Sequence, residues 1–452
     1  MRFSHSCLSL LLLALFLSPG SAASQRIVVA GPGAQVPIDP AAKAALVDSL
    51  CDGLNRIYVF PDVARQMEKG LRENLRKGRY DGLTTVQQFA RKLTEDMHEI
   101  SHDKHLAVLY TPPEEIAGDA AFMDWDKEAR ERRRKELERE NFMFRKLEVL
   151  PGNVGYLRFD AFPDATFSGP TAAAAMNFLA YCDALIIDLR MNGGGSPTLI
   201  QFMMGYLLDE PTHLNNFYMR KDDFTKQFWS APYTPGPKMA ETDLYVLVGP
   251  RTGSAAEEFA YNVQSLKRGT LIGESTWGGA HPVDLVAWKE LSAAAHIPFG
   301  RAINPVTGTN WEGTGAQPDI EVPVMAALDR AHLEALRTIR EREEDPQMLA
   351  RIDWAVAGLD AKLSPKEIDR SRFPSYAGVY GDRVLTYENG DLYYQRADRP
   401  KMKAIPMTET LFRFDEADFF RLEVVIDGGG SANLLRGHYD LGMIDESPRT
   451  AK

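Results

Sequence analysis

The sequence has few of the residues that build metal clusters and disulfide frameworks. It contains 3 cysteines in 452 residues, and none of them forms a Cys-x-x-Cys pair or a dense Cys/His cluster. Positive charge is also in deficit, since the formal net charge is -11. A chain of this charge is a poor partner for nucleic acid or an anionic membrane. The hydrophobic content of 44% and the charged content of 25% are ordinary for a soluble globular protein.

Apolar runs long enough to cross a bilayer are absent too, and the one apolar run at the N-terminus is short. Arg2 and His5 precede the run 8–17, and small residues follow it. This order is typical of a secretory signal peptide, and we expect cleavage near Ala23. The mature chain is then secreted or periplasmic and has no membrane span. It retains Cys51 and Cys182, whose pairing the sequence leaves open.

Changes in residue pattern predict several domains. Three amphipathic helical stripes follow one another up to about Ile100, and the third is entered through Thr84-Thr85, a capping pair. A dense run of mixed charge comes next, and aromatic strands between Gly, Asp and Asn turns occupy the C-terminal part. The expected units are a signal peptide (1–23), a helical domain (24–110), a charged connector (111–150), a core (151–326), a helical connector (327–370) and a small antiparallel β domain (371–452).

The most informative stretch of the core is a strand that turns into a helix at Ser254. Residues 244–248 form an apolar run rich in β-branched and aromatic residues, Gly and Pro break the run, and a helical pattern begins at Ala255. A serine there has an exposed hydroxyl beside free backbone N–H groups and the positive end of a helix. Such a site suits a nucleophile whose oxyanion must be stabilised. The simpler interpretation is that Ser254 only caps the helix.

A second strand runs into a glycine turn at 193–195 and then into a helix. Two such units predict an α/β core of repeated ββα units. The turn matches neither the P-loop nor the dinucleotide fingerprint. Its other use is to bring backbone N–H groups close to a reacting carbonyl. The helical Thr171–Cys182 stretch is expected to connect the first two strands of this core.

Four motifs in order resemble those of the C-terminal-processing (tail-specific) serine peptidases, over roughly residues 40–325. They are Asp-Leu-Arg-x-Asn-Gly-Gly-Gly at 188–195, Thr-Gly-Ser-Ala-Ala-Glu at 252–257, Gly-Glu-x-Thr-x-Gly-Gly-Ala at 273–280 and Glu-Gly-x-Gly-x-x-Pro-Asp at 312–319. The resemblance is strongest to the branch that includes the interphotoreceptor retinoid-binding protein and the tricorn-type peptidases. It implies a crotonase/ClpP-like core of ββα units after a helical N-terminal domain.

Two departures separate this chain from the tail-specific subgroup. Residues 111–150 are too short and too charged for a PDZ domain, and Gly279 stands where that subgroup has its catalytic lysine. A Ser–Lys dyad through that turn is therefore excluded. The other branch uses Ser, His and Glu, and the resemblance carries these roles onto Ser254, His105 and Glu312.

The resemblance then implies acyl transfer without a cofactor or a metal, on a protein or peptide substrate. His105 would act as the general base for Ser254, and Glu312 would orient and stabilise the imidazole, directly or through other groups. The backbone N–H groups of Ala255 and Gly194 would form the oxyanion hole.

Two other functions fit parts of the sequence. His98-Glu99-x-x-His102 is a literal zinc-peptidase signature, with Glu114 or Glu115 as the third-ligand candidate. Alternatively, the scaffold binds apolar ligands without catalysis, as the retinoid-binding relatives imply, with Trp277 and Trp311 as candidate lining residues.

Overall fold

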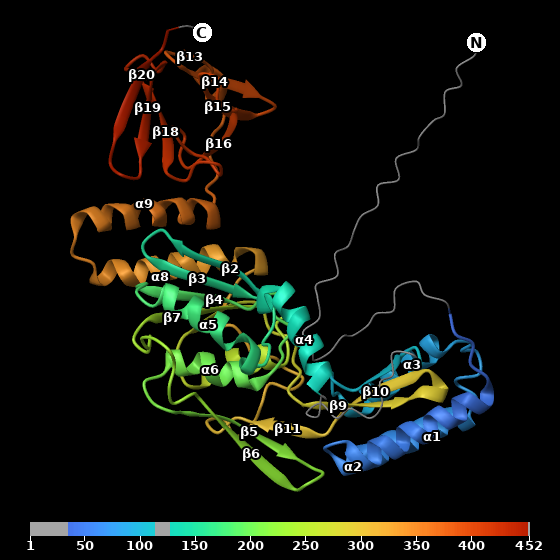
Figure 1. Ribbon diagram of the computed structural model, residues 1–452. Coiled ribbons are helices and arrows are strands. Elements are labelled where there is room, and N and C mark those ends of the chain that lie inside the picture. Colours follow the sequence, from blue (N-terminus) through green and yellow to red (C-terminus); the bar gives the residue numbers. More distant parts are fainter. Residues whose placement is uncertain (1–34, 114–126, 451–452) are drawn as a thin grey trace, which may run out of the picture.

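A computed structural model describes residues 35–113 and 127–450 of the chain. The N-terminal helices, the α/β core, a helical layer and the C-terminal β domain follow one another across the molecule (Figure 1). The predicted signal peptide lies outside the described residues. Within the described part, no helix combines the length and the apolar character needed to cross a membrane.

The helical N-terminal domain forms as predicted, with α1 (Pro40–Ile57), α2 (Pro61–Arg76) and α3 (Val86–Ser101). Thr85 caps α3 by accepting a hydrogen bond from the Gln88 N–H. Strand β1 (Ala107–Tyr110) follows. It pairs with β10 (Ala293–Pro298), which also pairs with β9 (Val283–Trp288). The domain is thus completed by residues from far along the chain, which a contiguous 24–110 unit did not predict.

These two later strands belong to the hydrophobic core of the helical domain. Ala295 and Ile297 of β10 are buried in one cluster with Leu50 and Phe89. Because short apolar strands carry no signal of which domain they join, the sequence placed them in the α/β core.

The α/β core is a six-stranded sheet in the order β12-β8-β7-β4-β3-β2. All neighbours are parallel except β2 and β3. The strands are β2 (Phe144–Leu150), β3 (Val154–Phe159), β4 (Ala184–Asp188), β7 (Asp243–Val248), β8 (Thr270–Gly273) and β12 (Ile320–Glu321). The prediction of a connector through residue 150 is wrong in its last part, because β2 is an edge strand of this sheet. The charged run before it forms α4 (Lys127–Arg139).

Helices cover both faces of this sheet. On one face, α5 (Ala165–Leu179), α6 (Pro197–Leu207) and α7 (Ala255–Ser265) pack against alternate residues of β3 and β4. On the other face lies α8 (Ala327–Arg342). Helix α5 begins before the predicted Thr171, because the Asp164 side chain accepts a hydrogen bond from the Thr166 N–H and starts the helix there.

The parallel arrangement brings the informative loops together. Strands β4, β7 and β8 are neighbours in the sheet, and the glycine turn, the Ser254 turn and the turn at 274–280 follow their carboxyl ends. The carboxyl ends of parallel strands meet at one edge of a sheet, where ligands and substrates are commonly bound. A smaller sheet of β11 (Gly300–Ile303), β5 (His213–Met219) and β6 (Phe224–Trp229) flanks the core.

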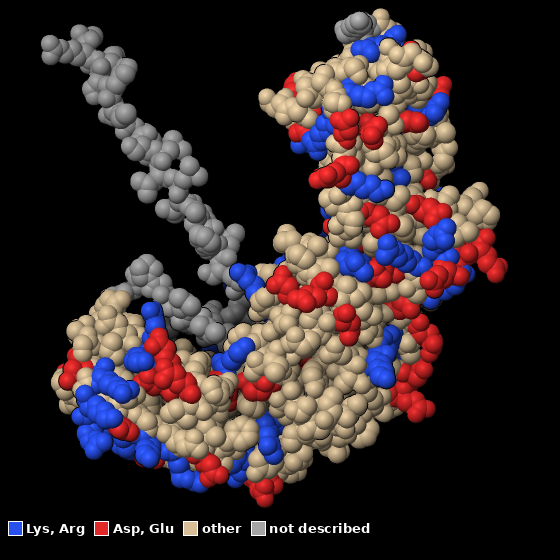
Figure 2. All heavy atoms as spheres, turned by 180° about the vertical axis from the view of Figure 1, so that it is seen from behind, with Lys and Arg blue, Asp and Glu red and all other residues tan. Residues whose placement is uncertain are grey.

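The C-terminal region is an antiparallel β domain, as predicted. It follows α9 (Pro346–Leu363) and α10 (Phe373–Tyr376). Its strands are β13 (Gly378–Tyr380), β14 (Arg383–Glu388), β15 (Asp391–Arg396), β16 (Met402–Pro406), β17 (Leu411–Arg413), β18 (Phe420–Ile426), β19 (Ala432–Tyr439) and β20 (Ile444–Pro448). The domain stands off from the core beyond the α8–α9 layer, whose surface carries mixed charge (Figure 2).

The two cysteines among the described residues do not pair. Cys51 and Cys182 are both free and buried, one in the N-terminal core and the other in the α/β core.

Candidate active site

Ser254 lies at the turn between β7 and α7, directly before the first residue of the helix. Its backbone has φ 53° and ψ -120°, a region that a residue with a Cβ seldom adopts and that occurs at functional sites. Thr252 fixes the turn by donating from its hydroxyl to the Leu189 carbonyl at 2.8 Å. Because Ala255 is the first residue of α7, its N–H has no acceptor within the helix. Ser254 is thus the N-cap residue and also has the geometry of a nucleophile elbow.

The glycine turn packs directly against this elbow. A Cβ on Gly194, whose φ is +100°, would lie 2.6 Å from the Gly253 carbonyl oxygen and 2.8 Å from the Ala255 nitrogen. The close approach therefore requires glycine. The Gly194 N–H itself donates to Asn192 Oδ1 at 2.9 Å, so a role in an oxyanion hole requires that this bond be exchanged for one to the substrate.

A buried carboxylate, Glu257, ties the elbow to the turn at 276–279. Its Oε2 accepts hydrogen bonds from the N–H groups of Ser254 at 2.8 Å and Gly279 at 3.0 Å. Its Oε1 accepts from the Gly278 N–H and from the Thr276 hydroxyl, both at 2.5 Å. Burial raises the pKa of Glu257 to about 7. The hydrogen-bond donors favour the charged form and lower the pKa, but their effect is smaller than that of burial.

His105 lies in the turn between α3 and β1, and its ring is buried. The imidazole meets Trp277 edge to face, with ring centroids 4.8 Å apart. Neither ring nitrogen has a hydrogen-bond partner among the described residues. Burial lowers the pKa of His105 to about 4, so the ring is neutral near pH 7 and able to accept a proton.

Gly279 packs directly against the His105 ring. A Cβ at this position would lie 2.5 Å from His105 Cε1 and 2.4 Å from Trp277 Cζ3. The space that a side chain at 279 would need is therefore filled by the His105 and Trp277 rings.

Glu312 reaches the segment that carries His105 rather than its ring. Its carboxylate accepts hydrogen bonds from the Lys104 N–H at 3.3 Å and from the Ala280 N–H at 2.5 Å. Burial, together with the charge of Asp103, raises the pKa of Glu312. The structure forms no hydrogen bond from His105 Nδ1 or Nε2 to Ser254 or Glu312, so the catalytic group of these three residues stays a prediction.

Asp103 and His281 are site residues that sequence reasoning missed. Asp103 Oδ1 accepts from the His105 N–H at 3.1 Å, and Asp103 Oδ2 lies 2.7 Å from His281 Nδ1. Burial opposes charge on His281, yet this bond to Asp103 and the nearby carboxylates raise its pKa. Asp103 belongs to the Asp-x-His-Leu segment and His281 directly follows the third motif. Their position beside these motifs is the sequence feature that could have identified them as site residues.

The zinc-peptidase hypothesis loses its geometric basis. One ring nitrogen of His98, Nε2, lies 2.6 Å from the Leu106 carbonyl oxygen. Helix α3 ends at Ser101, and His102 follows in a left-handed conformation with φ 54°. The two histidines are therefore not presented together on one helical turn, as the motif requires. Glu114 and Glu115 lie outside the described residues.

Two parts of the chain match known protein families. Residues 153–322 match "Peptidase family S41", a family of serine-type peptidases. Residues 41–143 match the domain described as the "N-terminal domain of Peptidase_S41 in eukaryotic IRBP". The chain therefore contains a peptidase S41 family domain at residues 153–322, preceded at residues 41–143 by the N-terminal domain that accompanies it in IRBP.

Individual relatives agree with this assignment. The chain is 33% identical over 103 residues to the tail-specific protease of Haemophilus influenzae, a match covering 21% of this chain and 13% of that protein. It is 28% identical over 182 residues to the carboxy-terminal-processing protease of Bartonella bacilliformis, covering 38% and 39%. The matched stretches thus span well under half of these curated relatives.

Among solved structures, the chain resembles the photosystem II D1 C-terminal processing protease at 16% identity and a TM-score of 0.41, covering 63% of this chain and 94% of that one. It resembles the tricorn protease at 13% identity and a TM-score of 0.42, covering 71% and 37%.

Substituting the glycines of the turn tests the close packing around Ser254. We expect Gly194→Ala to lower the free energy of unfolding by about 1–3 kcal/mol, because its backbone is left-handed and its Cβ would overlap the elbow. Gly193→Ala is the matched control, since a Cβ there meets nothing within 4 Å. Urea denaturation measures both, and equal stability of the two variants would contradict this packing.

Two adjacent buried carboxyl groups of α7 should respond differently to replacement by an amide, because four donors bond Glu257. Burial raises the pKa of Glu258 from 4.5 to about 7, so the native state favours its protonated form. Its contribution to stability is complete below about pH 4.5 and is lost as pH rises through about 7. We expect Glu258→Gln to be more stable than the wild type at pH 8, by up to about 3 kcal/mol, and the difference to shrink to about 1 kcal/mol or less at pH 5.

Glu257→Gln is the control for this pair. Its amide N–H₂ would face N–H donors that now bond to a carboxylate, so we expect it to be less stable than the wild type at pH 8. Denaturation curves at pH 5 and pH 8 compare the three proteins. A Glu258→Gln stability that follows the wild type at both values would refute the buried, protonated state.

Proposed function

We propose that the chain is a secreted serine peptidase that cleaves peptide bonds through an acyl-enzyme, with Ser254, His105 and Glu312 as its catalytic group. The main support for this proposal is the backbone conformation of Ser254. Ser254 stands at a strained strand-to-helix turn, with the first N–H of α7 beside it. A serine in this backbone conformation is typical of an exposed nucleophile rather than of a simple helix cap.

The neutral His105 imidazole supplies the general base. A serine hydroxyl is a weak nucleophile, so His105 takes the Ser254 proton as the oxygen attacks the substrate carbonyl, and then gives it to the leaving amine. Water then attacks the ester carbonyl of the acyl-enzyme. His105 takes the proton of this water and gives it to the Ser254 oxygen as that oxygen leaves. The low pKa of His105, about 4, keeps this base unprotonated at neutral pH. Its free ring nitrogens are available for this bond, which forms when the rings of His105 and Trp277 adjust around a substrate.

Glu312 acts on the base through the backbone. Its carboxylate holds the Lys104 N–H, and the next residue is the histidine. Its role is therefore to position the 103–105 segment and to stabilise positive charge on the imidazole. The oxyanion hole consists of the Ala255 N–H and the Gly194 N–H, the latter after it exchanges its bond to Asn192.

The substrate class is a protein or peptide, cleaved internally or near its C-terminus. The names of the relatives, tail-specific protease and carboxy-terminal-processing protease, favour this chemistry. The charged start, apolar run and small residues before position 24 favour export with removal of the signal peptide. The alternative of an apolar-ligand carrier is less favoured, because the Trp311 ring is buried and its N–H donates to the Gly279 carbonyl at 2.8 Å.

Active-site labelling with a fluorophosphonate tests the catalytic group. We expect one adduct per mature chain, at Ser254, and its loss in both Ser254→Ala and His105→Ala. Hydrolysis of an unstructured protein substrate should fall by about 10⁴-fold or more in each variant, and the double variant should be no worse than either alone, since the two groups act as a unit. Ser275→Ala, at an exposed serine nearby, is the control that keeps wild-type activity.

If His105→Ala is still labelled at Ser254, His105 is not the general base that activates the serine. Ligand binding or other function retained in full by Ser254→Ala would instead support the carrier.

A further inference from the structure

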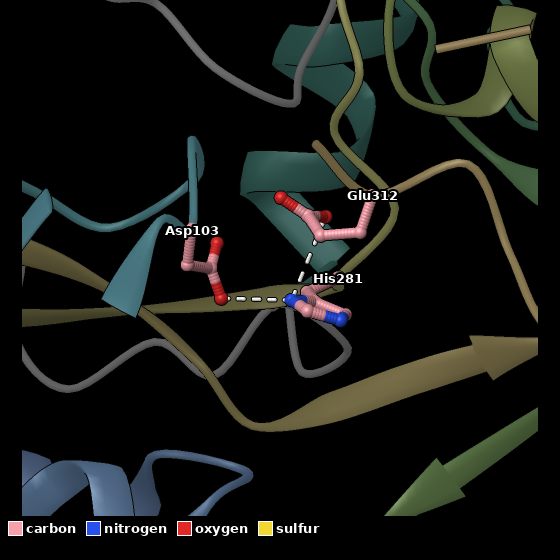
Figure 3. A group of neighbouring side chains, drawn as sticks. All are labelled: Asp103, His281 and Glu312. Carbon is pink, nitrogen blue, oxygen red and sulfur yellow. Dashed lines mark hydrogen bonds and ion pairs between the residues drawn. The ribbon is translucent and has the colours of Figure 1, made fainter. Parts of the chain in front are cut away.

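Asp103, His281 and Glu312 form a compact group, and the proposed hydrolytic mechanism gives a role to Glu312 alone among them. Asp103 comes from the turn after α3, His281 from the segment before β9 and Glu312 from the loop before β12. The two carboxylates approach the same ring nitrogen from different sides (Figure 3). His281 Nδ1 lies 2.7 Å from Asp103 Oδ2 and 3.5 Å from Glu312 Oε2.

The group offers three ligand atoms to a cation, one from each residue. A single N–H can point at one oxygen, and the shorter bond to Asp103 leaves Glu312 with only the weaker contact. One ligand atom from each of the three residues lies within 4.8 Å of the others. Tetrahedral zinc has bonds of about 2.0–2.1 Å, which place its ligand atoms about 3.3 Å apart. To become three ligands of one ion, the group would have to lengthen the 2.7 Å separation between His281 Nδ1 and Asp103 Oδ2 and close the wider separations, by shifts of up to about 1.5 Å.

The carboxylates are already held by further hydrogen bonds. The Tyr58 hydroxyl donates to Asp103 Oδ2 at 3.2 Å, and the His105 N–H donates to Asp103 Oδ1. Backbone N–H groups of Lys104 and Ala280 bond Glu312. Such outer partners fix the orientation of ligands in metal sites and account for part of the affinity.

A cavity gives the group access to solvent. It measures about 410 Å³, and both His281 and Glu312 line it. His102, Arg301 and Asn310 form further parts of its wall. The cavity supplies an entry path and room for water at a fourth position, while Asp103 is buried behind it.

We propose that Asp103, His281 and Glu312 bind one divalent transition-metal ion of the zinc type, entering through this cavity. The ion is bound by Nδ1 of a neutral His281 imidazole, whose hydrogen is on Nε2, and by the two carboxylates. This ligand set suits zinc, and it differs from the His98-Glu99-x-x-His102 signature. Sequence reasoning predicted no metal because these ligands come from three distant segments.

Binding would clamp three segments that meet at the site. Asp103 belongs to the N-terminal domain, while His281 and Glu312 belong to loops of the core. An ion that binds only the folded arrangement stabilises it by mass action. The proposal does not depend on peptidase activity, because it concerns only these ligands and the cavity.

Zinc titration of the Ser254→Ala chain tests the site separately from catalysis. The protein is first treated with a chelator, and binding is then measured by calorimetry with Zn²⁺ alone. We expect one ion per chain, together with a rise in melting temperature. His281→Asn, which keeps a polar side chain beside Asp103, should weaken binding by about 100-fold or more. Tyr58→Phe should weaken it by about 10-fold, because it removes an outer hydrogen bond.

His438→Asn is the matched control. It removes an imidazole that lies 2.8 Å from Glu423 in the β domain, so it should leave zinc affinity unchanged. Circular dichroism before titration checks that each variant is folded. Absence of binding by the folded parent, or equal affinity of the parent and His281→Asn, would overturn the proposal. Failure of fluorophosphonate labelling would leave this result unaffected, so the two proposals fail separately.

Discussion

The active-site region depends on one buried carboxylate. Glu257, in the first turn of α7, accepts hydrogen bonds from Ser254, Thr276, Gly278 and Gly279. It thereby joins the turn that carries the serine to the turn that packs on His105. A buried carboxylate is tolerated only with such partners, because leaving any of them unpaired would cost free energy. The position of the nucleophile and the wall of the histidine pocket are consequently set by the same side chain.

The proposed base and nucleophile come from different parts of the fold. Ser254 follows a central strand of the core sheet, whereas His105 follows the last helix of the N-terminal domain. Strands β9 and β10 leave the core and complete the N-terminal domain. The relative position of these two parts therefore controls the distance between the groups. The His105 ring is buried against Trp277, and neither of its nitrogens has a hydrogen-bond partner in the part of the chain that the structure describes.

Local patterns in the sequence predicted the three N-terminal helices, the strand–turn–helix at Ser254, the antiparallel C-terminal domain and the family. They failed where the deciding contacts are distant. Strand β2 was assigned to a connector because its outward residues are charged, and β9 and β10 were assigned to the core. The sequence did not identify Asp103 and His281 as site residues for the same reason. They are 178 positions apart, and only the folded chain brings them together.

The most direct test of the account is a crystal structure of the protein carrying a phosphonate on its active-site serine. Such an adduct resembles the tetrahedral intermediate of acyl transfer. The account predicts phosphorus on Ser254 Oγ, a phosphonyl oxygen bonded to the Ala255 N–H, and a His105 ring nitrogen within about 3 Å of an adduct oxygen. An adduct on another residue, or a His105 ring still packed on Trp277 with both nitrogens unpartnered, would contradict it.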